Sequence, residues 1–225
     1  MELSEVGRGY PSVASVNLSA IARNLAVLRA ASPTTIQMAI VKANAYGHGL
    51  IPVALASLKA GAQWLGVAQL AEALELRAGL DEAGIARKDA PIFAWISAMG
   101  TDFTAAIEAD IDLSVSWTWV LDEICAAARA LGRPARVHVK IDTGMSRAGS
   151  TLADLPELAQ ALREAQDQGL IEVVGAWSHM SRADDPSPSG EESTRSHVKI
   201  FEEGLRILAQ AGVRPQIRHL AATSG

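Results

Sequence analysis

Short apolar runs alternate with longer segments of helical periodicity along almost the whole chain, and this alternation limits the possible folds most strongly. Strands separated by helices pair in parallel, with right-handed crossovers between them. Two architectures satisfy this order, an open doubly wound sheet and a closed barrel. The pattern predicts seven main strands, in residues 36–41, 64–68, 91–96, 111–115, 136–142, 171–178 and 216–220.

A barrel would be incomplete in this chain. A TIM-type (β/α)8 barrel needs eight strands and about 250 residues. A further short strand is predicted at residues 13–17, and residues 187–192 are predicted to belong to a loop rich in Pro, Ser, Asp and Gly. We expect one α/β domain over residues 1–225, a TIM-type barrel truncated before its eighth strand. Helices are predicted in residues 18–32, 52–59, 72–80, 104–109, 117–131, 155–166 and 195–211.

A lysine at the end of an apolar run is the first candidate site residue. With the two-residue period of a strand, the apolar residues 36, 38 and 40 share a face with Lys42, so its ammonium would continue a buried row. Such a lysine is either a snorkelling side chain at a strand end or an amine whose pKa desolvation lowers, so that it can form a Schiff base. The glycines of the turn Tyr-Gly-His-Gly at residues 46–49 allow a ligand to approach closely, which favours the second interpretation.

The segment from Val41 to Gly49, Val-Lys-Ala-Asn-Ala-Tyr-Gly-His-Gly, resembles the pyridoxal-phosphate lysine signature of alanine racemases. Its Val-Lys-Ala-Asn core is also similar to the wider group of barrel-type pyridoxal-phosphate decarboxylases, and the Tyr-Gly-His-Gly turn narrows the resemblance to the racemases. The resemblance implies that Lys42 is the catalytic lysine that binds pyridoxal 5'-phosphate, and that Tyr46 belongs to the cofactor site.

A second group of polar residues lies in the strand predicted at residues 136–142 and in the loop after it. His138, Lys140 and Asp142 would point into a barrel, while the apolar residues between them face the helices. Buried charges must pair or become neutral, so these residues are either an internal salt-bridge network or part of a site. Arg147 comes next in the loop, where barrels build active sites, and its guanidinium can hold a carboxylate by two parallel hydrogen bonds.

This second segment, Asp-Thr-Gly-Met-Ser-Arg-Ala-Gly at residues 142–149, is also similar to alanine racemases. In that family the matching arginine helps to hold the substrate carboxylate, and the matching lysine, carbamylated in some members, supports the arginine. The resemblance implies substrate binding for Arg147 and a supporting role for Lys140.

His179 closes the strand predicted at residues 171–178, on the face predicted for Val173, Gly175 and Trp177. A histidine at a strand end is more often a hydrogen-bonded structural residue than a catalyst. The corresponding histidine of the racemases packs against the cofactor ring, and the resemblance implies a cofactor-binding role for His179.

The segment Arg218 to Ser224 resembles the racemase segment whose serine binds the cofactor phosphate, although family members usually have Asn at the position of Thr223. A hydroxyl and free backbone N–H groups at a strand-to-helix junction make an anion site, and barrels often bind phosphate near their last two strands. We expect Ser224 to be the phosphate ligand.

The composition favours a small-molecule partner. The 225 residues are 49% hydrophobic and 20% charged, and the net charge of −5 with mixed signs offers neither nucleic acid nor a membrane a basic surface. The five histidines include no His-Glu-x-x-His pair and the single cysteine cannot build a zinc cluster, so no metal site is expected. No secretory leader and no run near the ~20 apolar residues of a membrane span is present, so we expect a cytoplasmic protein.

The four motifs occur in the family's order, and together they imply an alanine racemase that interconverts L- and D-alanine, supplies D-alanine for peptidoglycan and forms a homodimer. Racemisation needs two bases on opposite faces of the substrate, and Lys42 supplies one. In the family the other is a tyrosine of a C-terminal β domain that reaches into the partner's site. The sequence has only Tyr10 and Tyr46, neither in a matching context, so we expect an N-terminal portion with impaired activity.

Two other functions stay open. One is a non-catalytic pyridoxal-phosphate-binding homeostasis protein of the same barrel fold, which the length of the chain favours. The other is an amino-acid decarboxylase of the same barrel type, which would also need a large second domain. The Tyr-Gly-His-Gly turn and the Asp-Thr-Gly-Met-Ser-Arg segment favour the racemase over both.

Overall fold

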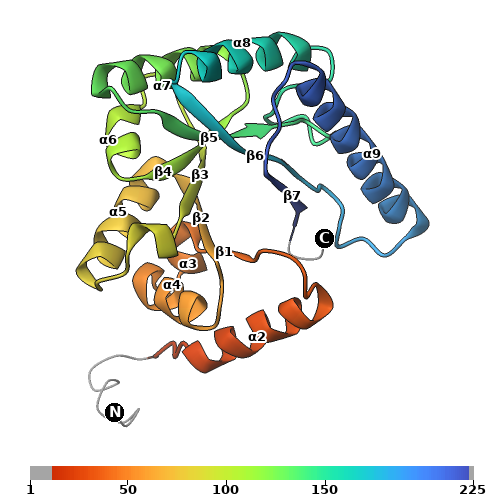
Figure 1. The fold of residues 1–225 in the computed structure, drawn as a ribbon. Helices are drawn as coiled ribbons and strands as arrows, with labels where there is room; N and C mark the ends of the chain where they lie inside the picture. The colour runs from red at the N-terminus through yellow and green to blue at the C-terminus, as the bar shows by residue number, and fades with distance from the viewer. Residues whose placement is uncertain (1–11, 223–225) are drawn as a thin grey trace.

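A curled sheet of seven parallel strands forms the centre of the molecule in the computed structural model, which describes residues 12–222 (Figure 1). The strands lie side by side in sequence order from β1 to β7, which confirms the predicted barrel-type fold and excludes a doubly wound sheet, whose strand order reverses. The strands are β1 (Met38–Ile40), β2 (Trp64–Gln69), β3 (Ile92–Ile96), β4 (Ile111–Val115), β5 (Ala135–Lys140), β6 (Ile171–His179) and β7 (Ile217–Ala221).

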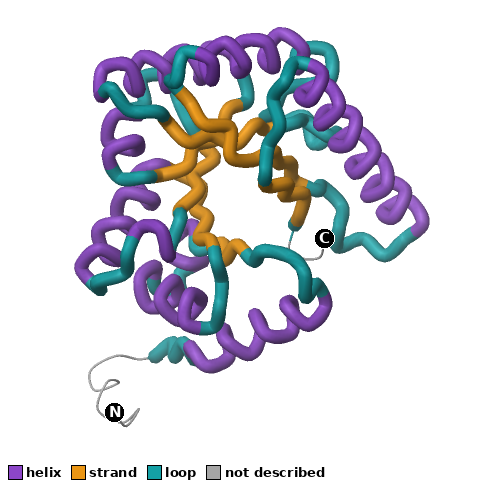
Figure 2. Tube along the Cα trace, in the orientation of Figure 1, coloured by secondary structure: helices purple, strands orange, loops and turns teal. Residues whose placement is uncertain are grey.

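The helices lie outside the curled sheet and connect its strands, as Figure 2 shows. All seven predicted helices are present; the ends of six lie within two residues of the prediction, and the last helix begins seven residues earlier than predicted, at Pro188. In the described part of the chain the helical elements are α2 (Leu18–Ala31), α3 (Lys42–Tyr46), α4 (Leu50–Lys59), α5 (Leu70–Glu82), the 3-10 turn η1 (Arg87–Asp89), α6 (Phe103–Glu108), α7 (Thr118–Leu131), α8 (Leu155–Asp167) and α9 (Pro188–Gln210).

The sheet separates two apolar layers. Side chains such as Leu65 and Ile92 belong to the large cluster that the strands share with the helices. Their neighbours Trp64 and Phe93 point to the other side, into the barrel, where they pack with Trp177. This alternation arises from the two-residue period of a strand, and it gives the barrel an aromatic interior.

A bulge in β6 breaks the alternation once. Val137 of β5 pairs with Val173, but the next residue of β5 pairs with Gly175, so Val174 is an extra residue. Val173 packs on the helix side, whereas Val174 and Trp177 lie in the interior cluster. The prediction that Val173 and Trp177 share a face is therefore wrong, because one inserted residue reverses the facing of the later residues of the strand.

Two predicted elements are wrong because helix caps occupy their positions. Residues 13–17 form no strand, and the side chain of Asn17 caps α2 by accepting hydrogen bonds from the N–H groups of Ser19 and Ala20 at 3.0 and 3.3 Å. In the predicted loop at residues 187–192, Ser187 caps α9 and Pro188 is its first residue. Proline suits that position, since its missing N–H has no partner there in any case.

The strand before Lys42 is shorter and more exposed than predicted. β1 has only three residues, and the side chains of Ile36 and Ile40 are 53% and 40% exposed. Among residues 12–222, β1 pairs with β2 alone, so its other edge leaves the apolar row partly uncovered. The predicted row of buried aliphatic side chains is therefore wrong.

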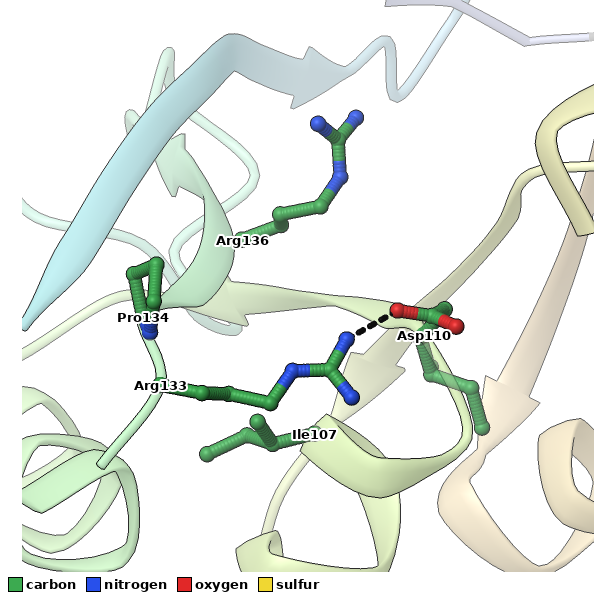
Figure 3. Close-up of a pocket in the computed structure, with 6 residues that line it drawn as sticks. Ile107, Asp110, Arg133, Pro134 and Arg136 are labelled. Carbon is green, nitrogen blue, oxygen red and sulfur yellow. Dashed lines mark hydrogen bonds and ion pairs between the residues drawn. The ribbon is translucent and has the colours of Figure 1, made fainter. Parts of the chain in front are cut away.

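An ion-pair network joins the amino ends of β4 and β5. Arg133 pairs with Asp110, as Figure 3 shows, and Nη1 of Arg87 lies 3.1 Å from the same carboxylate. Burial acts to raise the pKa of Asp110, but hydrogen bonds from Arg87 and Arg133 bring it below its usual value. A small cavity lined by Ile107 and Pro134 lies beside this network. It is at the amino ends of the strands, the end of a barrel where residues stabilise the fold.

Candidate active site

Four predicted site residues lie at the carboxyl ends of the strands. Lys140 and His179 are the last residues of β5 and β6. Lys42 lies two residues beyond β1, and Arg147 lies in the connection between β5 and α8. Barrel enzymes build their active sites at this end. Ser224, the predicted phosphate ligand, lies outside the described residues.

The surroundings of His179 bring these side chains into one cluster. Burial is the main cause of the lowered pKa of His179, and the positive charges of Arg147, Lys140 and Lys42 lower this pKa further. A hydrogen bond with the backbone of Ala221 acts in the opposite direction. Three cations around one imidazole create a positive potential that attracts anionic groups such as carboxylate or phosphate.

Lys42 begins a left-handed turn, the element α3. The four residues from Ala43 to Tyr46 have φ angles between 52 and 54°. Residues with a side chain avoid this conformation, which costs roughly 1–2 kcal/mol for each of them. Gly47 and Gly49 come next with φ angles of 83 and 99°, which glycine adopts without this cost. Such strain persists only where the surrounding structure maintains it, and it is concentrated at functional sites.

Two side chains that the sequence reasoning missed hold this turn. Oε1 of Glu72 accepts a hydrogen bond from the N–H of Ala43 at 2.6 Å, and its Oε2 accepts from the N–H groups of Ala68 and Gln69, at the end of β2, at 3.0 Å each. Oδ1 of Asn44 accepts from the N–H of Leu50 at 2.7 Å. A glutamate in the first turn of a helix suggests a cap, but no local pattern indicates its bond to Ala43.

Aromatic rings lie beside the amines of both Lys42 and Lys140. Nζ of Lys42 lies 5.6 Å from the ring centroid of Trp95 and 5.8 Å from that of Tyr46, which is itself 58% exposed. Nζ of Lys140 lies 4.5 Å from the ring centroid of Trp177. Each distance is within the range of about 6 Å over which a cation is attracted to an aromatic face.

Lys140 is buried, and its amine has a perturbed pKa. Burial is the main cause that lowers its pKa to about 8, the charge of Arg147 lowers it further, and Asp142 opposes the shift. A pKa near 8 leaves a larger neutral fraction at neutral pH than an ordinary lysine has. Arg147 is thus close enough for its charge to act on the amine of Lys140.

Arg147 lies exposed on a loop of fixed shape. Oδ1 of Asp142 accepts hydrogen bonds from the N–H groups of Gly144 and Ser146 at 3.0 Å each. Two backbone hydrogen bonds of 2.9 Å, both involving Ser150, close the base of the loop. The guanidinium is therefore free to meet a ligand while its backbone is held.

We also searched the described residues for a metal site and for a membrane-spanning helix. Between residues 12 and 222, no group of three or more His, Cys, Asp or Glu side chains has a metal-binding arrangement. Over the same residues, every helix is too short or too polar to cross a membrane. The charged cluster at Lys42 is thus the candidate site that these residues offer.

Comparison with known proteins agrees with the geometry. A family model described as alanine racemase, N-terminal domain, matches residues 16–225. The alanine racemase of Frankia casuarinae is 45% identical over 218 residues, which are 97% of this chain and 54% of that protein. The alanine racemase of Beutenbergia cavernae is 49% identical over 216 residues, which are 96% of this chain and 54% of that protein.

The fold agrees as well. The crystal structure of alanine racemase from Streptomyces lavendulae matches with a TM-score of 0.83 and 46% identity, over 91% of this chain and 51% of that chain. The chain thus spans about half the length of the relatives it matches. On sequence and fold together, the chain belongs to the alanine racemase family and corresponds to its N-terminal domain.

Proposed function

We propose that this chain binds pyridoxal 5'-phosphate and carries the lysine half of an alanine racemase. The observation that supports this most strongly is the gathering of Lys42, Lys140 and Arg147 around His179 at the carboxyl ends of the strands. An amine suits an aldehyde, a guanidinium suits a carboxylate, and aromatic side chains suit a planar ring. The residues present are therefore chemically compatible with this cofactor and with an amino acid.

Pyridoxal phosphate supplies, when bound, an electron sink for the negative charge that develops when an amino acid loses its Cα proton. Lys42 would hold the cofactor through its amine and then move a proton to or from Cα on one face of the substrate. Arg147 would bind the substrate carboxylate by two hydrogen bonds, with Lys140 as its support. Tyr46 and His179 would contact the cofactor, and Ser224 would bind its phosphate.

A second base is needed on the opposite face of the substrate. We assign it to a tyrosine in a further domain of a second copy, within a homodimer. The two tyrosines of this sequence, Tyr10 and Tyr46, do not stand in the context expected for that base. The complete enzyme would supply D-alanine for peptidoglycan in the cytoplasm, whereas this chain by itself would racemise alanine weakly or not at all.

The cofactor assignment is tested by adding pyridoxal phosphate to the purified chain. We expect a visible absorbance band, and after reduction with borohydride a mass increase located on Lys42 by peptide mapping. Lys42→Ala should lose both signals. Lys59→Ala, at an exposed lysine of α4, should retain them and serves as the matched control. An unchanged band in Lys42→Ala would refute the assignment.

The racemase assignment has its own measurement. The chain with cofactor is incubated with L-alanine, and the D-alanine formed is determined with a stereospecific assay. We expect a rate near background, because only one of the two bases is present. Rapid racemisation by the 225-residue chain would show that the second base lies within it. Release of carbon dioxide from an amino acid would favour a decarboxylase instead.

A further inference from the structure

A polar cluster beside the proposed site, buried except for one serine, joins α9 to two of the strand ends. We call Thr143, Ser178, Ser181 and His197 the His197 cluster. Nδ1 of His197 lies 2.6 Å from Oγ1 of Thr143, and Nε2 lies 3.0 Å from Oγ of Ser181. Oγ1 of Thr143 also lies 2.8 Å from Oγ of Ser178. The cluster thus forms one continuous chain of hydrogen bonds.

Three of the four residues of the cluster are buried, and the fourth, Ser181, is exposed, yet the side chain of each has a hydrogen-bond partner. The residues His197, Thr143 and Ser178 are only 3%, 2% and 4% exposed. A neutral imidazole donates from one nitrogen and accepts at the other, and the hydroxyl groups can rotate to suit either tautomer. Leaving any of these buried groups without a partner would be costly. The cluster therefore favours a single arrangement of the segments it joins.

Those segments carry two residues of the proposed site. Thr143 lies in the loop that presents Arg147, and Ser178 immediately precedes His179. Asp142 shapes this loop from within, since its carboxylate binds the loop's own backbone. The bond from Thr143 to His197 is different, because it ties the loop to a helix about fifty residues further along the chain.

We propose that His197 is a positioning residue that fixes the loop of Arg147 relative to His179, so that binding of the amino-acid carboxylate depends on it. The inference rests on the role proposed for Arg147. His197 does not touch the substrate in this proposal. A bidentate contact requires both nitrogens of a guanidinium to face the carboxylate, and a loop that shifts by an ångström loses one of the two bonds.

Four variants separate the bonds of the cluster. His197→Leu removes both ring contacts with a side chain of similar size, and Thr143→Val removes one hydroxyl while keeping the shape. His197→Asn keeps a polar group near the position of Nδ1, so it can retain the bond to Thr143. Ser181→Ala is the matched control, since it removes the contact on the other side of the same ring.

The first measurement is hydrogen exchange of the amides in residues 143–150 of the 225-residue chain. We expect exchange about tenfold faster in His197→Leu and Thr143→Val, and no further increase in the double variant, because both changes remove the bond between Thr143 and His197 that ties the loop to α9. His197→Asn and Ser181→Ala should stay near the unaltered chain. Amides of β4 report whether the fold is retained. Equal exchange in His197→Leu and the unaltered chain would overturn the proposal.

The second measurement uses two probes that differ by a carboxylate. Phosphopyridoxyl-alanine carries one, and pyridoxamine phosphate does not. We expect His197→Leu to bind the first probe about tenfold more weakly and the second equally well, with affinity restored in His197→Asn. Equal weakening of both probes would contradict a role at Arg147. If the unaltered chain binds neither probe, the proposed cofactor function fails, and the exchange rates alone decide whether His197 positions the loop.

Discussion

Lys42 is presented by a backbone that depends on bonds from outside its own turn. Four successive residues in the left-handed region are unfavourable by themselves, so the turn needs partners elsewhere in the fold. Glu72 is the most direct one, because its carboxylate binds the N–H of Ala43 and two N–H groups at the end of β2 together. One side chain of α5 therefore connects the turn of Lys42 to the second βα unit.

Glu72→Ala should lower the free energy of unfolding by about 1–3 kcal/mol, because three N–H groups lose a charged acceptor. The variant should also bind pyridoxal phosphate more weakly, since Lys42 would no longer be held in place. Urea unfolding and cofactor titration measure the two effects. Glu75→Ala, at an exposed position further along α5, is the control and should change stability by less than about 0.5 kcal/mol. Equal results for the two variants would contradict this role of Glu72.

His219 makes the stability of the barrel depend on pH. Its Nε2 lies 2.9 Å from Nδ1 of His138 inside the barrel, and its ring stacks on Trp177 with an angle of 7° between the planes. Burial, and then the nearby His138, lower the pKa of His219 to about 3. In the unfolded chain the same group has a pKa of about 6.5.

Unfolding should therefore become easier as the pH falls below about 6.5, because the unfolded state then binds a proton that the folded state refuses until about pH 3. The expected loss is roughly 1 kcal/mol per pH unit in this window. Urea unfolding at pH 7, 6 and 5 measures it, above the range in which ordinary carboxylates titrate. His219→Gln should reduce the slope, and an identical slope in both proteins would rule out His219 as its source.

At the scale of elements, the bulge in β6 allows β5 and β6 to pair closely around a histidine. It places Gly175 directly opposite His138, and a Cβ atom at position 175 would collide with the imidazole ring. The ring cannot move away easily, because Asp112 and His219 hold its two nitrogens at 3.1 and 2.9 Å. The pairing register of β5 and β6 therefore requires glycine at position 175.

Gly175→Ala should lower the free energy of unfolding by about 1–3 kcal/mol through overpacking, as measured by urea unfolding. The cause can be isolated with His138→Ala, which removes the ring that the new methyl group would meet. In that background Gly175→Ala should have little further effect. A similar loss with and without the imidazole would mean that the collision is not the cause.

The helices and strands were predicted well where the periodicity of the apolar residues indicates them. The apolar runs that become β2 to β6, and the amphipathic helices between them, are visible in the sequence as periodic patterns. Their order alone implied a parallel sheet. Asn17 and Ser187 were misread because a polar residue beside a short apolar run signals a helix cap as well as a turn. The left-handed turn after Lys42 has no period of its own, so no pattern could predict it.

At the scale of the whole molecule, the site depends on a sheet that gathers residues far apart in the chain. Lys42, Arg147 and His179 were predicted because each lies in a motif of its own. Glu72 and His197 were missed because their roles depend on contacts with distant segments, to Ala43 and Thr143. Local motifs thus predict the residues that would touch a ligand, whereas the residues that hold them in place become visible only in the fold.

The curled sheet leaves two strand edges without a neighbour among residues 12–222. β1 pairs only with β2, and β7 pairs only with β6. Ile36, next to the edge of β1, is 53% exposed. Unpaired N–H and C=O groups beside apolar side chains are a template for association between chains, and charged side chains at an edge oppose it.

We therefore expect the 225-residue chain to associate as its concentration rises, and Ile36→Lys to reduce this association. Sedimentation velocity over a range of concentrations measures both. Val27→Lys is the matched control, since Val27 lies on the helix α2 and not on a strand, and its side chain is 69% exposed. Adding the same charge there should leave the association unchanged if the edge is responsible. Equal effects of the two lysines would point to net charge, and a chain that stays monomeric at every concentration would show that the edge is already protected.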